Sequence, residues 1–211
     1  GGKGGLGNCH FTTSTHQAPT EHTDGERGED VTLRLELKII ADAGLVGFPN
    51  AGKSSLIRIL TDAHPKVAAY PFTTLHPVIG VLCYDDYKRV MIADIPGVIE
   101  GAHEGVGLGH DFLRHIERAP LLVFVIDMAG IDGRSPLDDY TNLRNELALH
   151  RADLGDKPSL VVANKMDVPE AKANLQEFMK STRISPLQVS AITGQGIDEL
   201  KKALRPFARL P

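Results

Sequence analysis

GLVGFPNAGKSSL, residues 44–56, is the stretch of sequence that decides how this chain folds. It contains eight residues, Gly47–Ser54, that fit G-x-x-x-x-G-K-[ST] between a short apolar run and an apolar helix start. Glycines let the backbone curl so that several N–H groups point inward, and the following helix adds the positive end of its dipole. The pattern therefore predicts a phosphate-binding loop. The alternative is a glycine turn before a helix, with a solvated lysine.

Two residues of this loop have expected roles in chemistry. We expect Lys53 to neutralise the β- and γ-phosphates of a nucleotide and Ser54 to supply an oxygen ligand to Mg²⁺. The other residues expected to contact the nucleotide here are Gly47, Phe48, Pro49, Asn50, Ala51 and Gly52.

Strand and helix patterns alternate along the rest of the chain. Apolar runs predict strands at 43–48, 78–84, 88–95, 121–127, 159–165 and 186–191, with a tight turn at 84–87. Helical patterns cover 54–60, 110–119, 136–152, 169–181 and 196–207. This order predicts an α/β fold, the P-loop NTPase G domain, with a mostly parallel six-stranded sheet and helices on both faces.

The beginning of the chain has a different composition. Residues 1–8 are glycine-rich, and residues 12–30 are polar with few apolar anchors, which is typical of a loose tail. Residues 31–40 alternate apolar and polar and predict a half-buried strand. We therefore expect a short glycine-rich β/coil segment over 1–41 and the G domain over 42–211.

Bulk properties exclude several classes of protein. The 211 residues carry a formal charge of −4, so no global basic field points to nucleic acid. The two cysteines have no metal-ligand spacing, which indicates free thiols in a reducing compartment. No apolar run is long enough to span a bilayer. We expect a cytoplasmic monomer that has no membrane partner.

A second motif indicates which nucleotide binds. Asn164-Lys165-Met166-Asp167 ends a predicted buried strand. A carboxylate at Asp167 can accept both the N1–H and the N2 amino group of guanine, whereas adenine has no donors at those positions. Asn164 would brace the base and the phosphate loop, and the Lys165 stem would cover the base. A backbone N–H in Ser190-Ala191-Ile192, after the next strand, could read guanine O6.

Two loops are expected to sense the γ-phosphate. Asp94-Ile95-Pro96-Gly97 follows a predicted strand, so Asp94 can hold Mg²⁺ through water while the Gly97 N–H reaches the γ-phosphate. Thr73 and Thr74 lie between the first helix and the second strand, and spacing alone leaves open which of them gives its hydroxyl to Mg²⁺. Such loops become ordered with GTP and relax after hydrolysis.

These motifs together resemble the Obg (also called CgtA) subfamily of translation-factor-class GTPases. The resemblance rests on GFPNAGKSSL, YPFTTL at 70–75, ADIPGVIEGAHEGVGLGHDFLRHIER at 93–118, ANKMD and SAITGQG. The upstream GGKGGLGN and LRLELKIIAD resemble the C-terminal end of the glycine-rich Obg fold that precedes the G domain in that family. About 40 residues of that fold are present.

The resemblance implies an Mg²⁺-dependent GTPase that binds the large ribosomal subunit during its assembly. It also implies that Thr74, rather than Thr73, is the second Mg²⁺ ligand beside Ser54. Residues expected by the same resemblance to contact nucleotide in the two loops are Phe72, Thr73, Thr74, Leu75, His76, Asp94, Ile95, Pro96 and Gly97. Ribosome binding depends in the family on glycine-rich fingers that are mostly missing from this segment.

Hydrolysis is expected to be slow, because Val98 occupies the position where many GTPases place a water-orienting glutamine. Three remedies are open: a partner such as the ribosome, a monovalent cation, or a polar residue such as Glu100 or His103. Asn50 bears on the second remedy, since related GTPases that use K⁺ have asparagine here. The alternative is that Asn50 only stabilises the loop turn.

Two other functions are compatible with these motifs. One is a binding module that holds GDP or an alarmone and barely hydrolyses GTP, which the absent glutamine permits. The other is an ATPase or kinase on the same phosphate loop, which requires that Asp167 does not read guanine. Competition of GTP against ATP distinguishes the ATPase or kinase from the GTPase and from the guanine-nucleotide-binding module.

Overall fold

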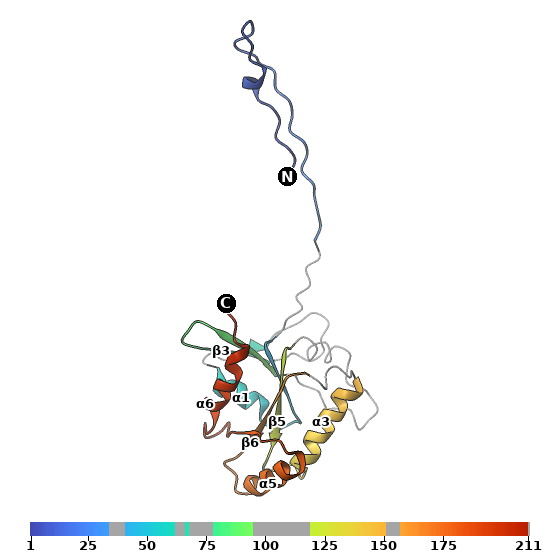
Figure 1. Cartoon of the computed structure of the whole chain (residues 1–211), viewed down its shortest axis with the longest axis vertical. Helices are drawn as coiled ribbons and strands as arrows, with labels where there is room; N and C mark the ends of the chain where they lie inside the picture. Colours follow the sequence, from blue (N-terminus) through green and yellow to red (C-terminus); the bar gives the residue numbers. More distant parts are fainter. Residues whose placement is uncertain (34–40, 62–65, 68–77, 95–118, 151–156, 211) are drawn as a thin grey trace. The chain divides into compact units, whose positions relative to one another are not determined.

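The computed structural model describes residues 1–33, 41–61, 66–67, 78–94, 119–150 and 157–210, without the side chains of residues 66–67 and 149–150 (Figure 1). The chain divides into two compact units, Gly1–Leu37 and Lys38–Pro211. Each unit is described by itself.

The first unit is built from two segments that run side by side. The Glu26 N–H donates to Lys3 O at 2.8 Å and the Thr23 N–H donates to Leu6 O at 3.0 Å. A side chain at Gly5 would overlap the carbonyl of Thr23, so the segments approach as closely as they do because this residue is glycine. The expectation of a loose tail is wrong for these residues, since composition does not show pairing between segments.

The second unit is a mixed sheet with strand order β2-β3-β4-β1-β5-β6-β7. β1, β4, β5, β6 and β7 are parallel to one another, and β3 pairs antiparallel with β2 and β4. The strands are β1 (Ala43–Val46), β2 (Lys66–Val67), β3 (Val78–Cys83), β4 (Arg89–Asp94), β5 (Leu121–Asp127), β6 (Ser159–Asn164) and β7 (Leu187–Gln188).

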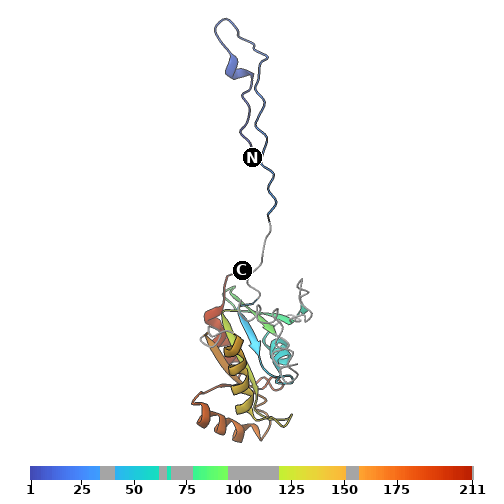
Figure 2. The same ribbon diagram turned by 90° about the vertical axis from the view of Figure 1, so that its right-hand side faces the viewer.

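Helices cover both faces of this sheet (Figures 1 and 2). On one face α1 and α6 pack on Leu121, Val123 and Val125 of β5. On the other face α3 and α5 pack on the intervening residues of β5, because successive strand side chains point to opposite faces. The helices are α1 (Lys53–Leu60), α3 (Pro136–His150), α5 (Ala171–Thr182) and α6 (Ile197–Leu204), with 3₁₀ helices η1 (Asn8–Phe11) and η3 (Arg205–Phe207).

The structure confirms the α/β architecture and the six predicted strands of the G domain, and it adds one strand. β2 has two residues and pairs with Val78 and Ile79 of β3. Two residues are too few to produce an alternating pattern, so the sequence does not predict this strand. The predicted turn at 84–87 is present, with the Tyr87 N–H donating to Tyr84 O at 3.1 Å.

Helix and strand ends differ from the prediction by a few residues. α6 stops at Leu204 and continues as η3, because Pro206 has no N–H to donate to an α-helical bond. β7 forms only at Leu187–Gln188. Most of the expected strand at 31–40, and all but the last residue of the expected helix at 110–119, lie outside the described residues.

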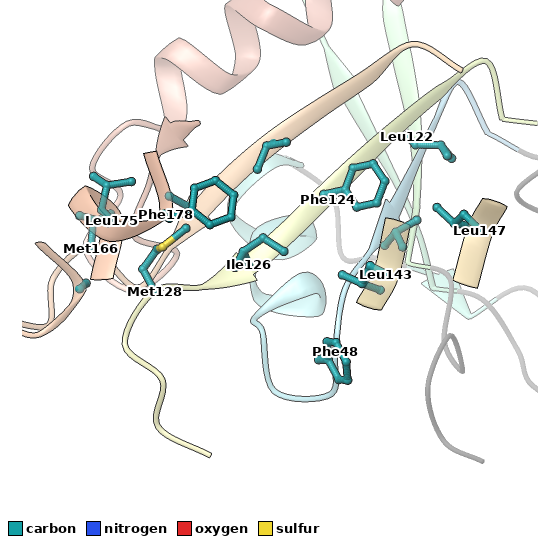
Figure 3. Close-up of a cluster of buried hydrophobic side chains, with 14 of the residues drawn as sticks. Phe48, Leu122, Phe124, Ile126, Met128, Leu143, Leu147, Met166, Leu175 and Phe178 are labelled. Atoms are coloured by element: carbon teal, nitrogen blue, oxygen red, sulfur yellow. The ribbon is translucent and has the colours of Figure 1, made fainter. Parts of the chain in front are cut away.

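The hydrophobic core reaches the predicted phosphate loop through Phe48. This side chain is 6% exposed and belongs to the cluster formed by β5, α3 and α5, with Phe124 and Leu143 among its members. Figure 3 shows Phe48 on the loop that follows β1, below α3. The loop is therefore fixed to the core by its own second residue.

Candidate nucleotide-binding site

The predicted site residues follow the carboxyl ends of neighbouring parallel strands. β1 ends at Val46, β4 at Asp94, β5 at Asp127 and β6 at Asn164. The register pairs Leu45 with Asp94, and Asp127 with Asn164, so these ends meet at one edge of the sheet. In open α/β sheets, ligands bind outside this edge.

The phosphate loop leads from β1 into α1 through a left-handed residue. Gly52 caps α1 with a φ of 93°, a conformation that costs glycine little, and an added Cβ would overlap the amide of Asn164. The Lys53 ammonium donates to Gly47 O at 2.9 Å and to Phe48 O at 3.1 Å. Lys53 therefore lies over the loop, where it can meet a bound phosphate.

Ser54 and Asp94 bring oxygen atoms together from two motifs that are 40 residues apart. The Ser54 hydroxyl donates to Asp94 Oδ2 at 2.6 Å. Asp94 is 6% exposed, and its Oδ1 has no hydrogen-bond partner in the described part of the chain. Mg²⁺ prefers such hard oxygen atoms and is held by few protein ligands beside nucleotide phosphates. The pair therefore fits Mg²⁺.

No group of three or more His, Cys, Asp or Glu that could hold a metal occurs among the described residues. The Ser54–Asp94 pair is compatible with this finding, because a nucleotide-bound Mg²⁺ takes most of its ligands from phosphate and water.

The Asn164–Asp167 motif contacts both of its predicted neighbours. Asn164 donates from Nδ2 to Ala51 O at 2.8 Å, which links this motif to the phosphate loop. Its Oδ1 accepts from the Ala191 N–H at 3.2 Å. The Ser190 hydroxyl donates to Asp167 Oδ1 at 2.6 Å. The structure thus brings together three of the predicted stations.

Three residues of the Asn164–Asp167 and Ser190–Ile192 motifs differ in whether their side chain or backbone N–H is available to a nucleotide. Met166 is 8% exposed and belongs to the hydrophobic cluster of α3 and α5 (Figure 3). The Ser190 N–H donates to Gln195 O at 3.0 Å. Ile192 is 82% exposed, and its N–H has no partner within the described residues.

The two predicted γ-phosphate loops lie outside the described residues, apart from Asp94. These predictions concern Phe72, Thr73, Thr74, Leu75, His76, Ile95, Pro96, Gly97, Val98, Glu100 and His103. The assignment of Thr74 to Mg²⁺ and of Gly97 to the γ-phosphate therefore stays a prediction.

Sequence reasoning missed Asp127. The Lys165 ammonium donates to Asp127 Oδ2 at 2.7 Å, and the Ala129 N–H donates to Asp127 Oδ1 at 2.9 Å. The side chain of Asp127 is 6% exposed in this ion pair. A signal was available, because Asp127 ends an apolar strand in the same way as Asp94.

Arg134 is a second residue that sequence reasoning missed. Its guanidinium carbon lies 4.8 Å from the centroid of the Phe48 ring, and its Nη2 donates to Pro49 O at 3.4 Å. Nε lies 3.2 Å from Oδ1 of Asp139, and Nη2 lies 3.2 Å from Oδ2 of Asp132. No local pattern marks this residue as part of the site, since its contacts with Phe48 and Pro49 are brought together by the fold.

Burial raises the pKa of Asp139 above its ordinary value, although the nearby Arg134 cation acts in the opposite direction. Nearby carboxylates, Asp127 and Asp138, add to the increase of this pKa. Asp132, Arg134 and Asp139 thus form a charged cluster beside the phosphate loop, which Arg134 contacts at Phe48 and Pro49.

Comparison with known families decides where this arrangement belongs. The sequence profile described as "50S ribosome-binding GTPase" matches residues 42–165, and the profile described as "GTP1/OBG" matches residues 1–39. The chain belongs to the Obg family of GTPases. The first profile covers the phosphate loop, Asp94 and the first two residues of the Asn164–Asp167 motif, and the second covers the glycine-rich unit.

Relatives of known sequence and structure agree with this membership. The chain is 54% identical over 205 residues to GTPase Obg of Akkermansia muciniphila, covering 97% of this chain and 59% of that protein. The structure resembles the G domain of the T. maritima FeoB iron transporter, with a TM-score of 0.53 and 25% identity, covering 78% of this chain and 96% of that domain.

A second solved structure is that of Aquifex aeolicus Era Y63A bound to GDP and AlF4⁻. It has a TM-score of 0.58 and 26% identity, and the match covers 83% of this chain and 58% of that chain. This Obg-family chain spans between 47% and 64% of the length of the curated relatives it matches. None of its described helices is long and apolar enough to cross a membrane.

Proposed function

We propose that this Obg-family chain binds GTP with Mg²⁺, hydrolyses it slowly to GDP, and acts as a nucleotide-dependent switch in the assembly of the large ribosomal subunit. The observation that supports this proposal is the meeting of Ser54, Asp94 and Asn164 with the phosphate loop at one edge of the sheet. We further propose that it acts as a cytoplasmic monomer.

In this proposal each described residue has one task. Lys53 stabilises negative charge on the β- and γ-phosphates. Its ammonium exchanges its hydrogen bonds to the loop carbonyls for contacts with these phosphates. Ser54 and Asp94 would hold Mg²⁺, which supplies positive charge to the phosphates when bound. Asp167 accepts two hydrogen bonds from guanine, and Asn164 keeps the base motif against the loop. We assign a third Mg²⁺ contact to Thr74 and a γ-phosphate contact to the Gly97 N–H.

The experiment that tests this proposal is multiple-turnover hydrolysis of GTP by the full chain, with Lys53→Ala as the blank. We expect slow turnover by the wild type and none above background by Lys53→Ala, because the lysine stabilises charge that develops during phosphoryl transfer. ATP in excess should not compete, because adenine offers Asp167 no donors. Inhibition by equimolar ATP would reject guanine recognition.

Two further arms of this experiment identify the activator. Asn50 donates from Nδ2 to Asp132 Oδ2 at 3.4 Å, so its Oδ1 can still accept a cation. Faster turnover in K⁺ than in Na⁺ at equal ionic strength supports a K⁺ ligand at Asn50. Equal rates in both salts, with acceleration by large ribosomal subunits, support an external activator and a turn-stabilising role for Asn50.

A second candidate function is a binding module for GDP or an alarmone with negligible hydrolysis. Val98 in place of glutamine favours it, because valine cannot hydrogen-bond the attacking water. Tight GDP binding without GTP turnover, even with ribosomal subunits present, would select this function.

A further inference from the structure

Asp127 is a buried carboxylate at the site edge that the proposed function does not use. It is the last residue of β5 and pairs in register with Asn164 of β6. The strands β5 and β6 lie side by side in Figure 1. Lys165 follows Asn164 directly. Asp127 thus lies next to the base-binding motif, although 37 positions of sequence separate it from Asn164.

Both oxygens of Asp127 are occupied. Oδ1 accepts the Ala129 N–H at 2.9 Å, which fixes the carboxylate against its own backbone. Oδ2 accepts the Lys165 ammonium at 2.7 Å, with the two side chains 6% and 18% exposed. A mostly buried, charge-assisted bond of this length holds its partner more firmly than a solvated pair would.

The backbone of Lys165 limits where its side chain can go. Its φ of 64° lies in the left-handed region, which is uncommon for lysine. The turn is held on both sides, because the Val168 N–H donates to Lys165 O and the Met166 N–H donates to Val189 O, each at 3.1 Å. With this backbone fixed, the position of the Lys165 ammonium depends only on its side-chain rotamer. The ion pair with Asp127 stabilises one of these rotamers.

The alternative partner of Lys165 is the residue that reads guanine. Asp167 is two positions further along the same turn and is exposed, with Oδ1 accepting the Ser190 hydroxyl. A lysine ammonium is a compact charge on a flexible stem and can pair with any nearby carboxylate. If Lys165 paired with Asp167, the oxygens needed for guanine would be blocked.

We propose that Asp127 is a positioning residue that holds the Lys165 ammonium away from Asp167 and thereby keeps Asp167 available for guanine. This inference rests on the proposed function, because it concerns recognition of the same base. Asp127 needs no contact with the nucleotide for this role.

The test uses variants that break the ion pair from each side. Asp127→Asn removes the charge but retains an oxygen for the Ala129 N–H, and Lys165→Met removes the ammonium but retains an apolar stem. The double variant combines both changes. GDP and IDP affinities are measured by competition against a fluorescent GDP, because hypoxanthine offers Asp167 one donor where guanine offers two.

We expect Asp127→Asn to weaken GDP binding by about tenfold, equivalent to about 1.4 kcal/mol. IDP should weaken less, so the preference for GDP over IDP falls. The double variant should regain the wild-type preference, because it has no ammonium to compete for Asp167. A merely structural role would not produce this recovery.

Asp42→Asn is the matched control. The Asp42 side chain is also buried, at 7% exposed. It accepts one backbone N–H from Met91 and pairs with one cation, Arg209, but it precedes β1 at the opposite edge of the sheet. We expect this variant to lose thermal stability without a change in either affinity.

Two results would overturn the inference. One is wild-type affinities and preference in Asp127→Asn, and the other is a preference that stays reduced in the double variant. Failure of the proposed function looks different, because the wild-type chain itself would then bind GDP no better than ADP.

Discussion

Arg134 shows how one residue can stabilise a nucleotide loop from outside the motif. Its guanidinium lies over the Phe48 ring and forms an ion pair with Asp139, which is 4% exposed. Arginine suits this position because a planar guanidinium can stack on a ring and pair with a carboxylate at the same time. The phosphate loop and the start of α3 are therefore held together by a single side chain.

The raised pKa of Asp139 leads to a prediction about pH. A carboxyl whose pKa is higher in the folded state than in the unfolded state favours folding at low pH, and this contribution is lost as pH rises through the folded pKa. Asp139→Asn has no such titration. We expect the variant to gain stability relative to the wild type as pH rises from about 4, near the ordinary pKa of an aspartate, towards neutral pH.

Urea unfolding of both proteins across this range measures the difference in unfolding free energy. Asp138→Asn, an exposed neighbour in the same first turn of α3, is the control and should show a smaller dependence on pH than Asp139→Asn, because Asp139 itself still titrates in it. A difference for Asp139→Asn that stays constant with pH would contradict the assignment.

At the scale of elements, α6 and the chain after it hold the hairpin formed by β3 and β4. The backbones of Arg89 and Arg209 exchange two hydrogen bonds of 2.9 Å each. Tyr84 of the hairpin turn donates its hydroxyl to Lys201 O at 2.6 Å. A tyrosine hydroxyl is protonated at neutral pH, and burial raises the pKa of Tyr84 further above this range.

Arg209→Ala should destabilise the second unit. Arg209 Nε lies 2.9 Å from Oδ1 of Asp42, whose side chain is 7% exposed, and the substitution leaves this carboxylate without its cation. We expect a loss of about 1–2 kcal/mol of unfolding free energy, because Arg209 itself is half exposed. Urea unfolding at neutral pH gives the value.

Arg205→Ala is the control for this substitution. Arg205 pairs with Asp86 at 3.2 Å, but both side chains are substantially exposed. Exposed pairs contribute less than about 1 kcal/mol. An equal or larger loss for Arg205→Ala would show that burial does not decide the energetics at this edge.

At the scale of the whole molecule, the sheet carries its own core. Every buried hydrophobic side chain in the two clusters lies between Ala41 and Leu204. We propose that residues 1–41 are the C-terminal remnant of an Obg-type glycine-rich domain and that 42–211 form a separate G domain.

Deletion of residues 1–37 tests this proposal. We expect the shortened chain to bind GDP within about twofold of the full chain, because no described site residue is removed. A tenfold change in affinity would correspond to a loss of about 1.4 kcal/mol of binding free energy. Competition against a fluorescent GDP measures the affinity. An insoluble product, or a tenfold weaker affinity, would contradict the domain division.

Much of the fold was predictable because its signals are local. The phosphate loop is a run of eight residues, and the strands and helices follow from apolar periodicity within short windows. The same methods missed β2, which is too short for a pattern, and the pairing of residues 3–6 with residues 23–26, which depends on contacts between segments.

The sequence by itself determined the G-domain class, the guanine motif and the positions of Lys53, Ser54, Asp94 and Asp167. Only the tertiary structure decided that Asp127 binds Lys165 and that Arg134 covers Phe48. These partners lie 38 and 86 positions apart, so strand order and register bring them together. A pattern read along the chain can place an aspartate at a strand end, but its partner depends on which strand lies beside it.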